Sequence, residues 1–376
     1  MSLEIKKVSG RKALRQFVLF PERLYRNNPY YVPKIFFDEM GTLDAASNPA
    51  SDFCKFELYM AYLDGVPAGR VAAIINYKAN EAWNHDEVRF GWFDTIDNPD
   101  VARALIAAVE DFGRANGMDH IVGPLGFTDF DPEGLLVEGF DQISTLPLFY
   151  SYPYYQKYIE GMGFEKDADW LEYVIRIPEK LPEKFERVAN IVRERYDFRV
   201  RQVTRKLIRK EDYAHKIFQL LGETYKDLYE YTVLPVNLAD KYIGFYLKIL
   251  DLRYLSVVEN SNGELVAFGI TMPSLAKALQ KSRGRIFPFG WWHLLKALFI
   301  KHSDVAELLL MGARPDVRKT GVTALVVEDI LRKYNEMGIK WAETNAELED
   351  NHSIRNHFDD FERIQNKRRR SYKKKL

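Results

Sequence analysis

Residues 308–323 read LLLMGARPDVRKTGVT, and this stretch decides how the chain is interpreted. Its apolar start predicts a buried strand that ends near Met311 and Gly312. A turn with Pro315 follows, and a helical pattern begins after Gly321. A helix start offers backbone N–H groups and a partial positive charge, and a glycine lets an anion approach the backbone closely. Three basic side chains near the turn add formal charge, namely Arg314, Arg318 and Lys319. The stretch therefore predicts a site for a diphosphate.

The pattern around this stretch predicts a sheet flanked by helices in the second half of the chain. Ser261-Asn262-Gly263 is typical of a hairpin between two of its strands, and Gly338 is typical of a helix end. In order we expect a strand at 198–203, helices at 211–229 and 238–250, strands at 253–259, 264–272 and 306–311, a helix at 322–337, a strand at 340–345, a helix at 353–361 and a strand at 364–372.

The first half repeats this order, with Asp64-Gly65 as its hairpin turn. The expected elements are a helix at 11–26, strands at 54–63, 68–77 and 88–93, a helix at 101–117, and strands at 120–122 and 170–177. The PEKLP segment at 178–182 is the best boundary between the halves. The sequence thus predicts an α/β (α+β) chain of two similar domains, 1–178 and 179–376. Each is expected to be a mixed, mostly antiparallel sheet flanked by helices.

Composition excludes several classes of protein. The chain has 376 residues, which suits two domains, and 54 basic side chains balance 54 acidic ones, so it is not a general polyanion binder. A single cysteine, Cys54, cannot form an internal disulfide or a cysteine-based zinc site, which indicates a cytoplasmic location. We expect no signal peptide and no membrane-spanning helix, because no apolar run is long enough.

The residues 318–323, RKTGVT, are similar to the Q/R-x-x-G-x-G/A loop of the GNAT acyl-CoA N-acyltransferase superfamily. The strings at 89–99, 122–141 and 342–374 resemble bacterial two-lobed GNAT-like proteins of unassigned substrate. The resemblance implies tandem GNAT-like domains. It also implies that the loop holds the pyrophosphate of acetyl-CoA or a longer acyl-CoA, through Arg318, Lys319, Thr320, Gly321, Val322 and Thr323. Thr323 departs from the pattern, which has Gly or Ala there. Amides near Met311 and Gly312 are expected to hold the acyl carbonyl.

The resemblance also assigns roles after the next strand. Asn351 matches the asparagine that opens the last helix and contacts the cofactor, although a simple N-cap explains it equally well. Phe358 stands where the family commonly has a tyrosine that protonates the leaving CoA thiolate. Tyr372 or His357 is the expected substitute for that acid.

Acidic residues at the end of the strand at 340–345 are candidates for the general base. Glu343 and Glu347 are the first choices, with Glu349 and Asp350 beside them, and a solvated acidic loop is the alternative. Glu307 on the preceding strand is a further candidate, although a salt-bridged carboxylate at a strand edge is the favoured interpretation of it.

The first half lacks the phosphate loop, because three aspartates occupy 94–100 and would repel a diphosphate. Its long connection at 123–140 carries Asp131 and Glu133, which can hold an acceptor amine. A purely structural loop and a metal site are the alternatives, although the spacing lacks an EF-hand ligand set, so we expect no metal. Tyr154, in an aromatic cluster, is a candidate to line the acceptor groove, with core packing as the alternative.

Two segments allow other interpretations. The run at 363–375 holds eight basic residues, and we expect a strand with solvated side chains rather than a nucleic-acid-binding tail. The segment FPFGWWHLLKALFI at 287–300 can lie on a membrane surface, cover the sheet or line an acyl channel. Buried packing is the expectation that we adopt.

The sequence therefore predicts an acyl-CoA-dependent N-acyltransferase that modifies an unidentified small-molecule or peptide amine. The missing tyrosine at Phe358 leaves a non-catalytic binding module with the same fold as one alternative. An aminoacyl transferase of the Fem type is the other.

Overall fold

The structure is a computed structural model and describes residues 2–226, 228–300, 303–351 and 358–376. Most of the helix predicted at 353–361, including His357, lies outside these residues. The other predicted helices and strands are present, with ends shifted by a few residues. The strand predicted at 198–203 is shorter and covers only Arg199–Val200.

The first half contains a helical pair, a hairpin and a βαβ unit. Asp64 and Gly65 join the hairpin strands with φ values of 49° and 77°, as a tight hairpin turn requires. Its main elements are β1 (Leu3–Lys7), α1 (Gly10–Leu24), α2 (Phe36–Thr42), β2 (Cys54–Leu63), β3 (Val66–Asn76), α3 (Tyr77–Trp83), β4 (Glu87–Thr95), α4 (Pro99–Ala115), β5 (His120–Gly123), β6 (Leu135–Glu138), α5 (Tyr154–Gly161) and β7 (Glu165–Arg176).

The second half repeats this order after an additional helix. Gly338 ends α12 in the left-handed conformation, with φ at 71°. Its main elements are α6 (Glu183–Tyr196), β8 (Arg199–Val200), α7 (Arg205–Lys210), α8 (Tyr213–Tyr225), α9 (Val236–Ile249), β9 (Leu255–Glu259), β10 (Leu265–Pro273), α10 (Ala276–Ser282), α11 (Gly290–Leu295), a π-helical turn (Lys296–Ile300), β11 (Val305–Ala313), α12 (Thr323–Met337), β12 (Trp341–Thr344), β13 (Glu347–Leu348) and β14 (Arg363–Lys375).

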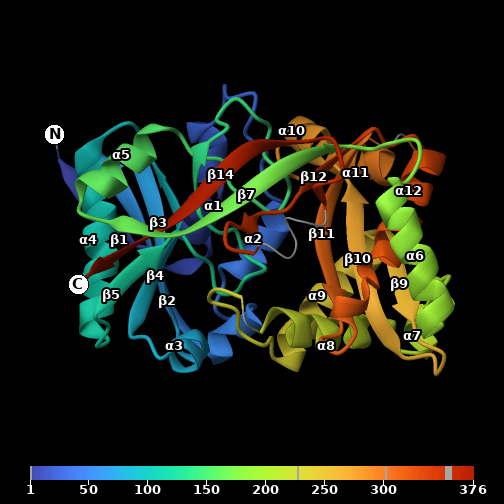
Figure 1. Cartoon of the computed structure of the whole chain (residues 1–376). Coiled ribbons are helices and arrows are strands. Elements are labelled where there is room, and N and C mark those ends of the chain that lie inside the picture. The colour runs from blue at the N-terminus through green and yellow to red at the C-terminus, as the bar shows by residue number, and fades with distance from the viewer. Residues whose placement is uncertain (1, 227, 301–302, 352–357) are drawn as a thin grey trace.

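The two halves share one continuous sheet because they exchange their last strands. The strand order is β1-β2-β3-β4-β5-β14-β7-β12-β11-β10-β9-β8. Thus β14, the last strand of the second half, pairs with β5 of the first half, and β7 pairs with β12 of the second. The two exchanged strands run side by side across the middle of the molecule (Figure 1). The halves are therefore joined by backbone hydrogen bonds as well as by the chain between them.

The basic residues of β14 are not a solvated run, which corrects the prediction for 363–375. Lys367 and Arg369 are almost fully buried beside Glu172 of β7. The neighbouring arginines, Arg368 and Arg370, pair with Asp169. Because both edges of β14 are paired, its central basic side chains lie inside the protein, where carboxylates balance their charges.

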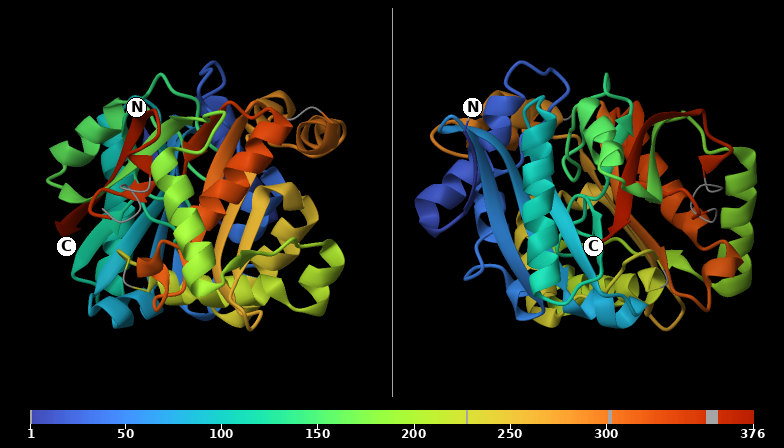
Figure 2. Two further views of the ribbon diagram at one scale, coloured as in Figure 1. Left: turned by 45° about the vertical axis from the view of Figure 1, so that its right-hand side comes forward. Right: turned by 90° about the vertical axis from the view of Figure 1, so that its left-hand side faces the viewer.

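Helices cover both faces of the sheet and form separate apolar cores. In the first half α4 lies along one face (Figure 2, right), and α1 packs on the other. In the second half α12 and α6 pack together on one face (Figure 2, left), and α8 covers the other.

The segment 287–300 is exposed, so the prediction of buried packing is wrong. It forms α11 and the π-helical turn, and Phe287, Phe289 and Trp292 are among its solvent-facing side chains. Only its inner side, for example Leu298, packs against the protein, which leaves the outer side uncovered. Within the described residues, no helix is long and apolar enough to cross a membrane.

Candidate functional site

Strands β11 and β12 lie side by side and then separate. They pair in parallel only from Val305–Trp341 to Leu308–Thr344. Beyond this point β11 continues to Ala313 against β10, and a β-bulge at Leu309 bends it. The gap between the two strands opens the sheet at their carboxyl ends.

A cavity of about 290 Å³ occupies this gap. One side of its wall comes from the face covered by α12, with Val327, Ile330 and Phe358. The opposite side comes from α8, with Ile217 and Leu221. The first half contributes its connection between β5 and β6 to the wall, so both halves form a single site. Most of the wall is apolar, which suits a hydrocarbon chain.

Three carboxyl groups form a polar part of this wall, namely Asp129, Asp131 and Glu133. Burial raises the pKa of Asp129 to about 8 and that of Asp131 to about 7. Burial, and the nearby Asp129, also raise the pKa of Glu133 well above its usual range. Among the described residues, the Asp129 Oδ1 atom is buried without a hydrogen-bond partner. Asp131, with its pKa near 7, can accept a proton near neutral pH, and an ammonium group bound among the three carboxyl groups would favour their ionised forms.

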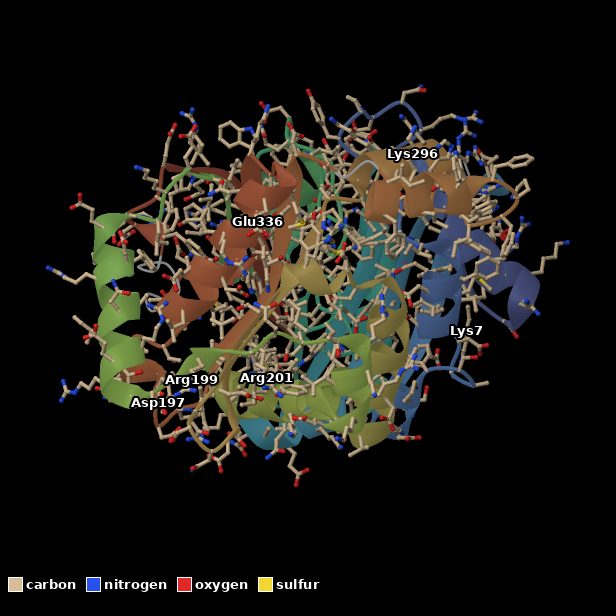
Figure 3. The ribbon with its side chains drawn as sticks, turned by 90° about the vertical axis from the view of Figure 1, so that its right-hand side faces the viewer. Lys7, Asp197, Arg199, Arg201, Lys296 and Glu336 are labelled. Carbon is tan, nitrogen blue, oxygen red and sulfur yellow. The ribbon has the colours of Figure 1, made fainter. Side chains whose placement is uncertain are left out.

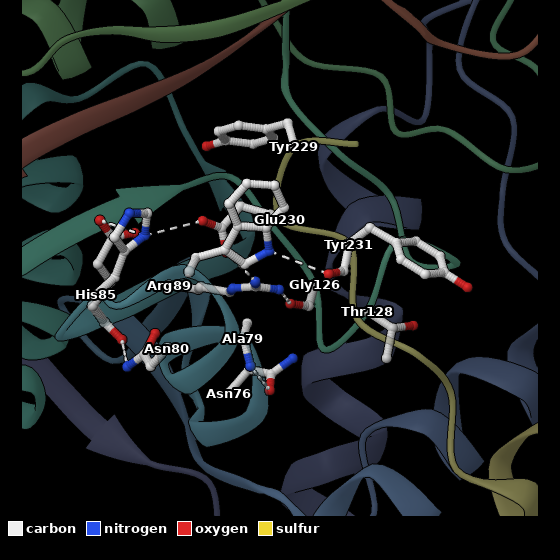
Figure 4. A network of polar contacts seen from close by, with 12 residues as sticks. Asn76, Ala79, Asn80, His85, Arg89, Gly126, Thr128, Tyr229, Glu230 and Tyr231 are labelled. Carbon is white, nitrogen blue, oxygen red and sulfur yellow. Dashed lines mark hydrogen bonds and ion pairs between the residues drawn. The ribbon is translucent and has the colours of Figure 1, made fainter. Parts of the chain in front are cut away.

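The acidic connection is held in place by Arg89 of β4. Its guanidinium donates to the Gly126 carbonyl oxygen at 3.2 Å and to Glu230 Oε2 at 2.6 Å (Figure 4). Gly126 is required for the fold of the connection, because a Cβ atom there would lie 2.1 Å from the Cβ atom of Asp131. Glu230 belongs to the second half, so this ion pair fixes the acidic wall against the other lobe.

Next to this ion pair, His85, Glu87 and Glu230 form a group whose side chains could bind a metal ion. Ligand atoms of His85, Glu87 and Glu230 lie within 4.8 Å of one another. However, Lys373 pairs with Glu87 and Arg89 pairs with Glu230. The two cations already balance the carboxylates, so the geometry favours an ion-pair network over a metal site.

The structure brings several predicted site residues to the cavity. Met311, Glu347 and Asn351 line it, as do Asp131 and Glu133 from the other half. The sequence analysis missed Tyr225 of α8, whose hydroxyl donates to the Met311 carbonyl oxygen at 3.1 Å. Burial raises the pKa of Tyr225 to about 12, so the phenol stays protonated at neutral pH. No motif marked it, because α8 is far from the strand end in sequence.

Other predicted residues lie away from the cavity wall. Glu343 is buried on β12, where it accepts from Asn366 at 3.2 Å and pairs with Lys367. Tyr372 lies in the core of the first half and donates to Glu160 at 3.1 Å. Tyr154 packs among aromatic rings and donates to the Thr95 carbonyl oxygen at 2.8 Å.

Glu307 and Glu349 also have other surroundings. Glu307 of β11 is buried and accepts from the backbone N–H of Leu146 at 3.2 Å. Burial raises its pKa to about 7, and the described residues offer it no ion pair within 4.0 Å, which differs from the salt-bridged carboxylate that we expected. Glu349 pairs with Lys166 and Arg368, both at 2.8 Å.

The predicted phosphate loop forms a tight turn before α12. Gly321 has a φ of 86°, Arg318 and Lys319 are exposed, and the N-cap residue Val322 makes no side-chain cap bond. Gly312, on β11, is buried. Thr320 and Thr323 stand on either side of Gly321 and are half-buried.

The corresponding helix of the first half differs at its start. Asn98 caps α4, and its side chain accepts from the backbone N–H groups of Asp100 at 2.9 Å and Val101 at 3.3 Å. In addition, Asp94 is buried in an ion pair with Arg70 at 2.8 Å. The amides that would bind an anion are already used at α4.

Two curated proteins are similar in sequence. The chain is 27% identical over 374 residues to "Protein YghO" of Escherichia coli K12, covering 96% of this chain and 93% of that protein. It is 26% identical over 315 residues to "Bacterial ceramide synthase" of Caulobacter vibrioides, covering 80% of this chain and 78% of that protein. No protein-family model matches the chain.

Solved structures share the fold. A tandem GNAT protein from the clavulanic acid biosynthesis pathway has a TM-score of 0.56 at 12% identity, over 100% of this chain and 98% of that one. A probable N-acyltransferase from Enterococcus faecalis has a TM-score of 0.52 at 8% identity, over 100% of this chain and 73% of that one. The chain is thus a protein of the GCN5-related N-acetyltransferase fold. In particular, it has the two-lobed fold of a tandem GNAT protein, as its sequence predicts.

Proposed function

We propose that the protein is an acyl-CoA-dependent N-acyltransferase whose acceptor is a long-chain, lipid-like primary amine. In this proposal residues 1–178 supply the carboxylates that bind the amine, and residues 179–376 supply the acyl-CoA site. Acetyl-CoA and longer acyl-CoA remain the candidate donors. We place the reaction in the cytoplasm, where CoA thioesters are formed.

The observation that carries the proposal is the composition of the cavity wall. Asp129, Asp131 and Glu133 offer charge for an ammonium group, and the rest of the wall is mainly apolar. A small hydrophilic amine would leave that apolar wall in contact with water, whereas a long-chain amine would cover it. The cavity also reaches Met311, at the end of the strand where the acyl carbonyl is expected.

The chemistry follows from these positions. A carboxylate such as Asp131 takes a proton from the bound ammonium group, and its raised pKa matches this task. The free amine attacks the thioester carbonyl carbon, and backbone N–H groups near the bulge in β11 stabilise the oxyanion. The C–S bond then breaks and the amide forms, and the proton that the nitrogen loses reaches the departing CoA sulfur, directly or through a phenol such as Tyr225.

The sequence comparison supports the choice of acceptor. Ceramide synthesis joins a fatty acyl group to the amine of a long-chain base, and one of the two curated relatives is named for that activity. A long-chain base carries one ammonium group on an alkyl chain, which is the pattern of the cavity wall.

A transfer assay tests the proposal. CoA release is measured with acetyl-CoA and palmitoyl-CoA as donors, and with sphinganine and ethanolamine as acceptors. We expect turnover with sphinganine and at least about tenfold less with ethanolamine, because ethanolamine lacks the apolar chain. Failure of every donor to react with either amine, while CoA still binds, would favour the binding-module alternative.

Paired variants separate the acceptor site from the donor site. Asp131→Asn/Glu133→Gln should raise the KM for sphinganine by about tenfold or more and leave the Kd of CoA unchanged, because only the ammonium contact is lost. Asp141→Asn, an exposed acid in the same part of the chain, is the control. If the variant loses as much affinity for CoA as for sphinganine, the two acids do not act specifically on the acceptor, and their assignment to the acceptor site is wrong.

A further inference from the structure

An exposed apolar patch lies on α11 and the π-helical turn that follows it. Of the fifteen large apolar side chains exposed in the described part of the chain, seven lie in residues 287–300. They are Phe287, Phe289, Trp291, Trp292, Leu295, Phe299 and Ile300. Phe289 is 76% exposed, and the ring of Phe37 on α2 extends the patch beside Phe287, with centroids 6.5 Å apart. Such a concentration is unusual for a surface that meets only water.

The exposure does not result from a loose segment, because the inner side of the patch is anchored. The Gln280 amide donates to the Pro29 carbonyl oxygen at 2.7 Å and to the Tyr31 carbonyl oxygen at 3.0 Å. The Gly284 carbonyl oxygen accepts from the Phe36 N–H at 2.9 Å. These bonds tie residues 280–284, just before the patch, to the first half, and Leu298 within the segment packs in an apolar cluster with Val32. The aromatic side chains are therefore presented outward on a fixed support.

The charges of the segment itself have one sign, whereas Glu22 and the exposed Asp38, which follows Phe37, lie beside it on α1 and α2. Residues 274–300 contain no Asp or Glu, and the exposed charged side chains there are Lys277, Lys281, Arg283, Arg285 and Lys296. Arg285 pairs with Glu22 at 3.1 Å. Lys296, which follows Leu295 of the patch, is exposed in the upper part of the molecule (Figure 3). A basic border around exposed Trp and Phe side chains is typical of segments that lie in the headgroup region of a bilayer.

We propose that residues 287–300 dock on the surface of an anionic lipid bilayer, with the aromatic side chains in the headgroup region and the lysines on the lipid phosphates. Charge complementarity selects this partner, since an anionic membrane offers both an apolar layer and negative charge. The docking surface stands on these observations alone, independently of the catalytic proposal.

The patch lies near the cavity, which suggests that docking brings the enzyme to a substrate held in the bilayer. This part of the inference rests on the proposed function. The inner side of the segment packs in a cluster that includes Leu298 and Leu279 and touches Leu309 and Leu146. Leu309 also lines the cavity, as does Pro147, the neighbour of Leu146. The side chains beneath the docked face therefore contact the cavity wall through Leu309, and we infer that a long-chain amine dissolved in the bilayer enters on this side.

Vesicle co-sedimentation of the full chain, without substrates, tests the docking surface. The probe is phosphatidylglycerol and phosphatidylcholine vesicles at low salt, with pure phosphatidylcholine vesicles for comparison. We expect the protein to bind the anionic vesicles, and we expect this binding to weaken with added salt. The triple variant Phe289→Ser/Trp291→Ser/Trp292→Ser should bind the same vesicles about tenfold more weakly or worse. Lys277→Ala/Lys281→Ala/Lys296→Ala should reduce the preference for anionic vesicles.

A matched variant controls for the loss of apolar surface. Ile191→Ser/Val233→Ser/Val236→Ser removes three exposed apolar side chains outside the patch and should bind vesicles like the parent. Equal binding of the patch variant and the parent, or no binding of the parent, would overturn the proposal. So would a dimer in light scattering that the patch variant abolishes while vesicles are not bound. Vesicle binding by a protein that transfers no acyl group would leave the docking surface standing and overturn only the proposed function.

Discussion

The Nε atom of Arg369 on β14 donates a 2.7 Å hydrogen bond to Oε1 of Glu172 on β7, and both side chains are almost completely excluded from solvent. Lys367, two residues earlier, contacts the other oxygen of Glu172 at 3.0 Å. The two strands belong to different halves of the sequence, so this buried cluster holds the exchanged strand in its register. Burial opposes the charge on Glu172, but Lys367 and Arg369 keep its pKa below the usual range.

Glu172→Gln should therefore destabilise the protein by about 3–5 kcal/mol, because it leaves buried cations without their carboxylate. The measurement is the free energy of unfolding in urea. The control is Glu362→Gln, which removes an exposed pair with Arg176 and should cost no more than about 1 kcal/mol. If the two variants lose similar amounts of unfolding free energy, the buried cluster does not stabilise the strand exchange.

Stability should fall as pH rises, because of the acids in the cavity. The folded protein raises the pKa of Asp129 to about 8 and of Asp131 to about 7, from 3.8, so it binds protons that the unfolded chain releases. Their contribution is complete below pH 3.8 and is lost as pH rises through about 7 to 8. We expect Asp129→Asn/Asp131→Asn to remove most of this decline between about pH 5 and 8, because neither asparagine titrates.

Thermal or urea unfolding at a series of pH values measures this decline in the protein without substrate. Asp100→Asn/Asp111→Asn, which changes two exposed acids, is the control and should keep the parent's pH dependence. An unchanged pH dependence in the cavity variant would mean that the two aspartates are not desolvated in solution.

Charge reversal at the turn before α12 should weaken CoA binding. Arg318→Glu/Lys319→Glu places negative charge where the diphosphate is expected, and should raise the Kd of CoA by at least about tenfold at low salt. Both side chains are exposed, so the fold is not at risk. A change at Gly321 is less informative, because a Cβ atom there would lie 2.7 Å from Val188 Cγ1.

Calorimetric titration of CoA measures this effect, with Lys6→Glu/Arg103→Glu in the first half as a control of equal charge change. CoA affinity that is unchanged in the Arg318 and Lys319 variant would remove the turn from the donor site.

Tyr225 is expected to assist the departure of the CoA thiolate. Tyr225→Phe should lower kcat by about tenfold and change KM little, because the phenol matters only as charge develops on sulfur. Phe358→Tyr, which restores a phenol at the cavity wall, should raise kcat. Tyr372→Phe should leave turnover unchanged, because Tyr372 is buried in the other core. If Tyr225→Phe has no effect when product release does not limit the rate, the phenol is not the acid.

Local sequence determined most of the secondary structure. The alternating pattern of 54–63, the Asp64-Gly65 turn and the helical spacing of 322–337 each depend on neighbours within a few residues, and each element is present. The repeated order of elements likewise predicts the two-lobed fold. Gly321 and Gly338 adopt the positive φ values that turns and helix ends require, which is also a local property.

Tertiary structure alone decided which strands pair and which side chains meet. A strand such as 363–375 has the same local preference whichever strands lie beside it, so its insertion between β5 and β7 cannot be read from its residues. That insertion turns a basic run into a buried set of ion pairs. Tyr225, Met311 and Asp131 are distant in sequence and line one cavity only because the halves are joined through the shared sheet. The exposure of 287–300 has the same origin, since an apolar segment is buried only where another part of the chain covers it.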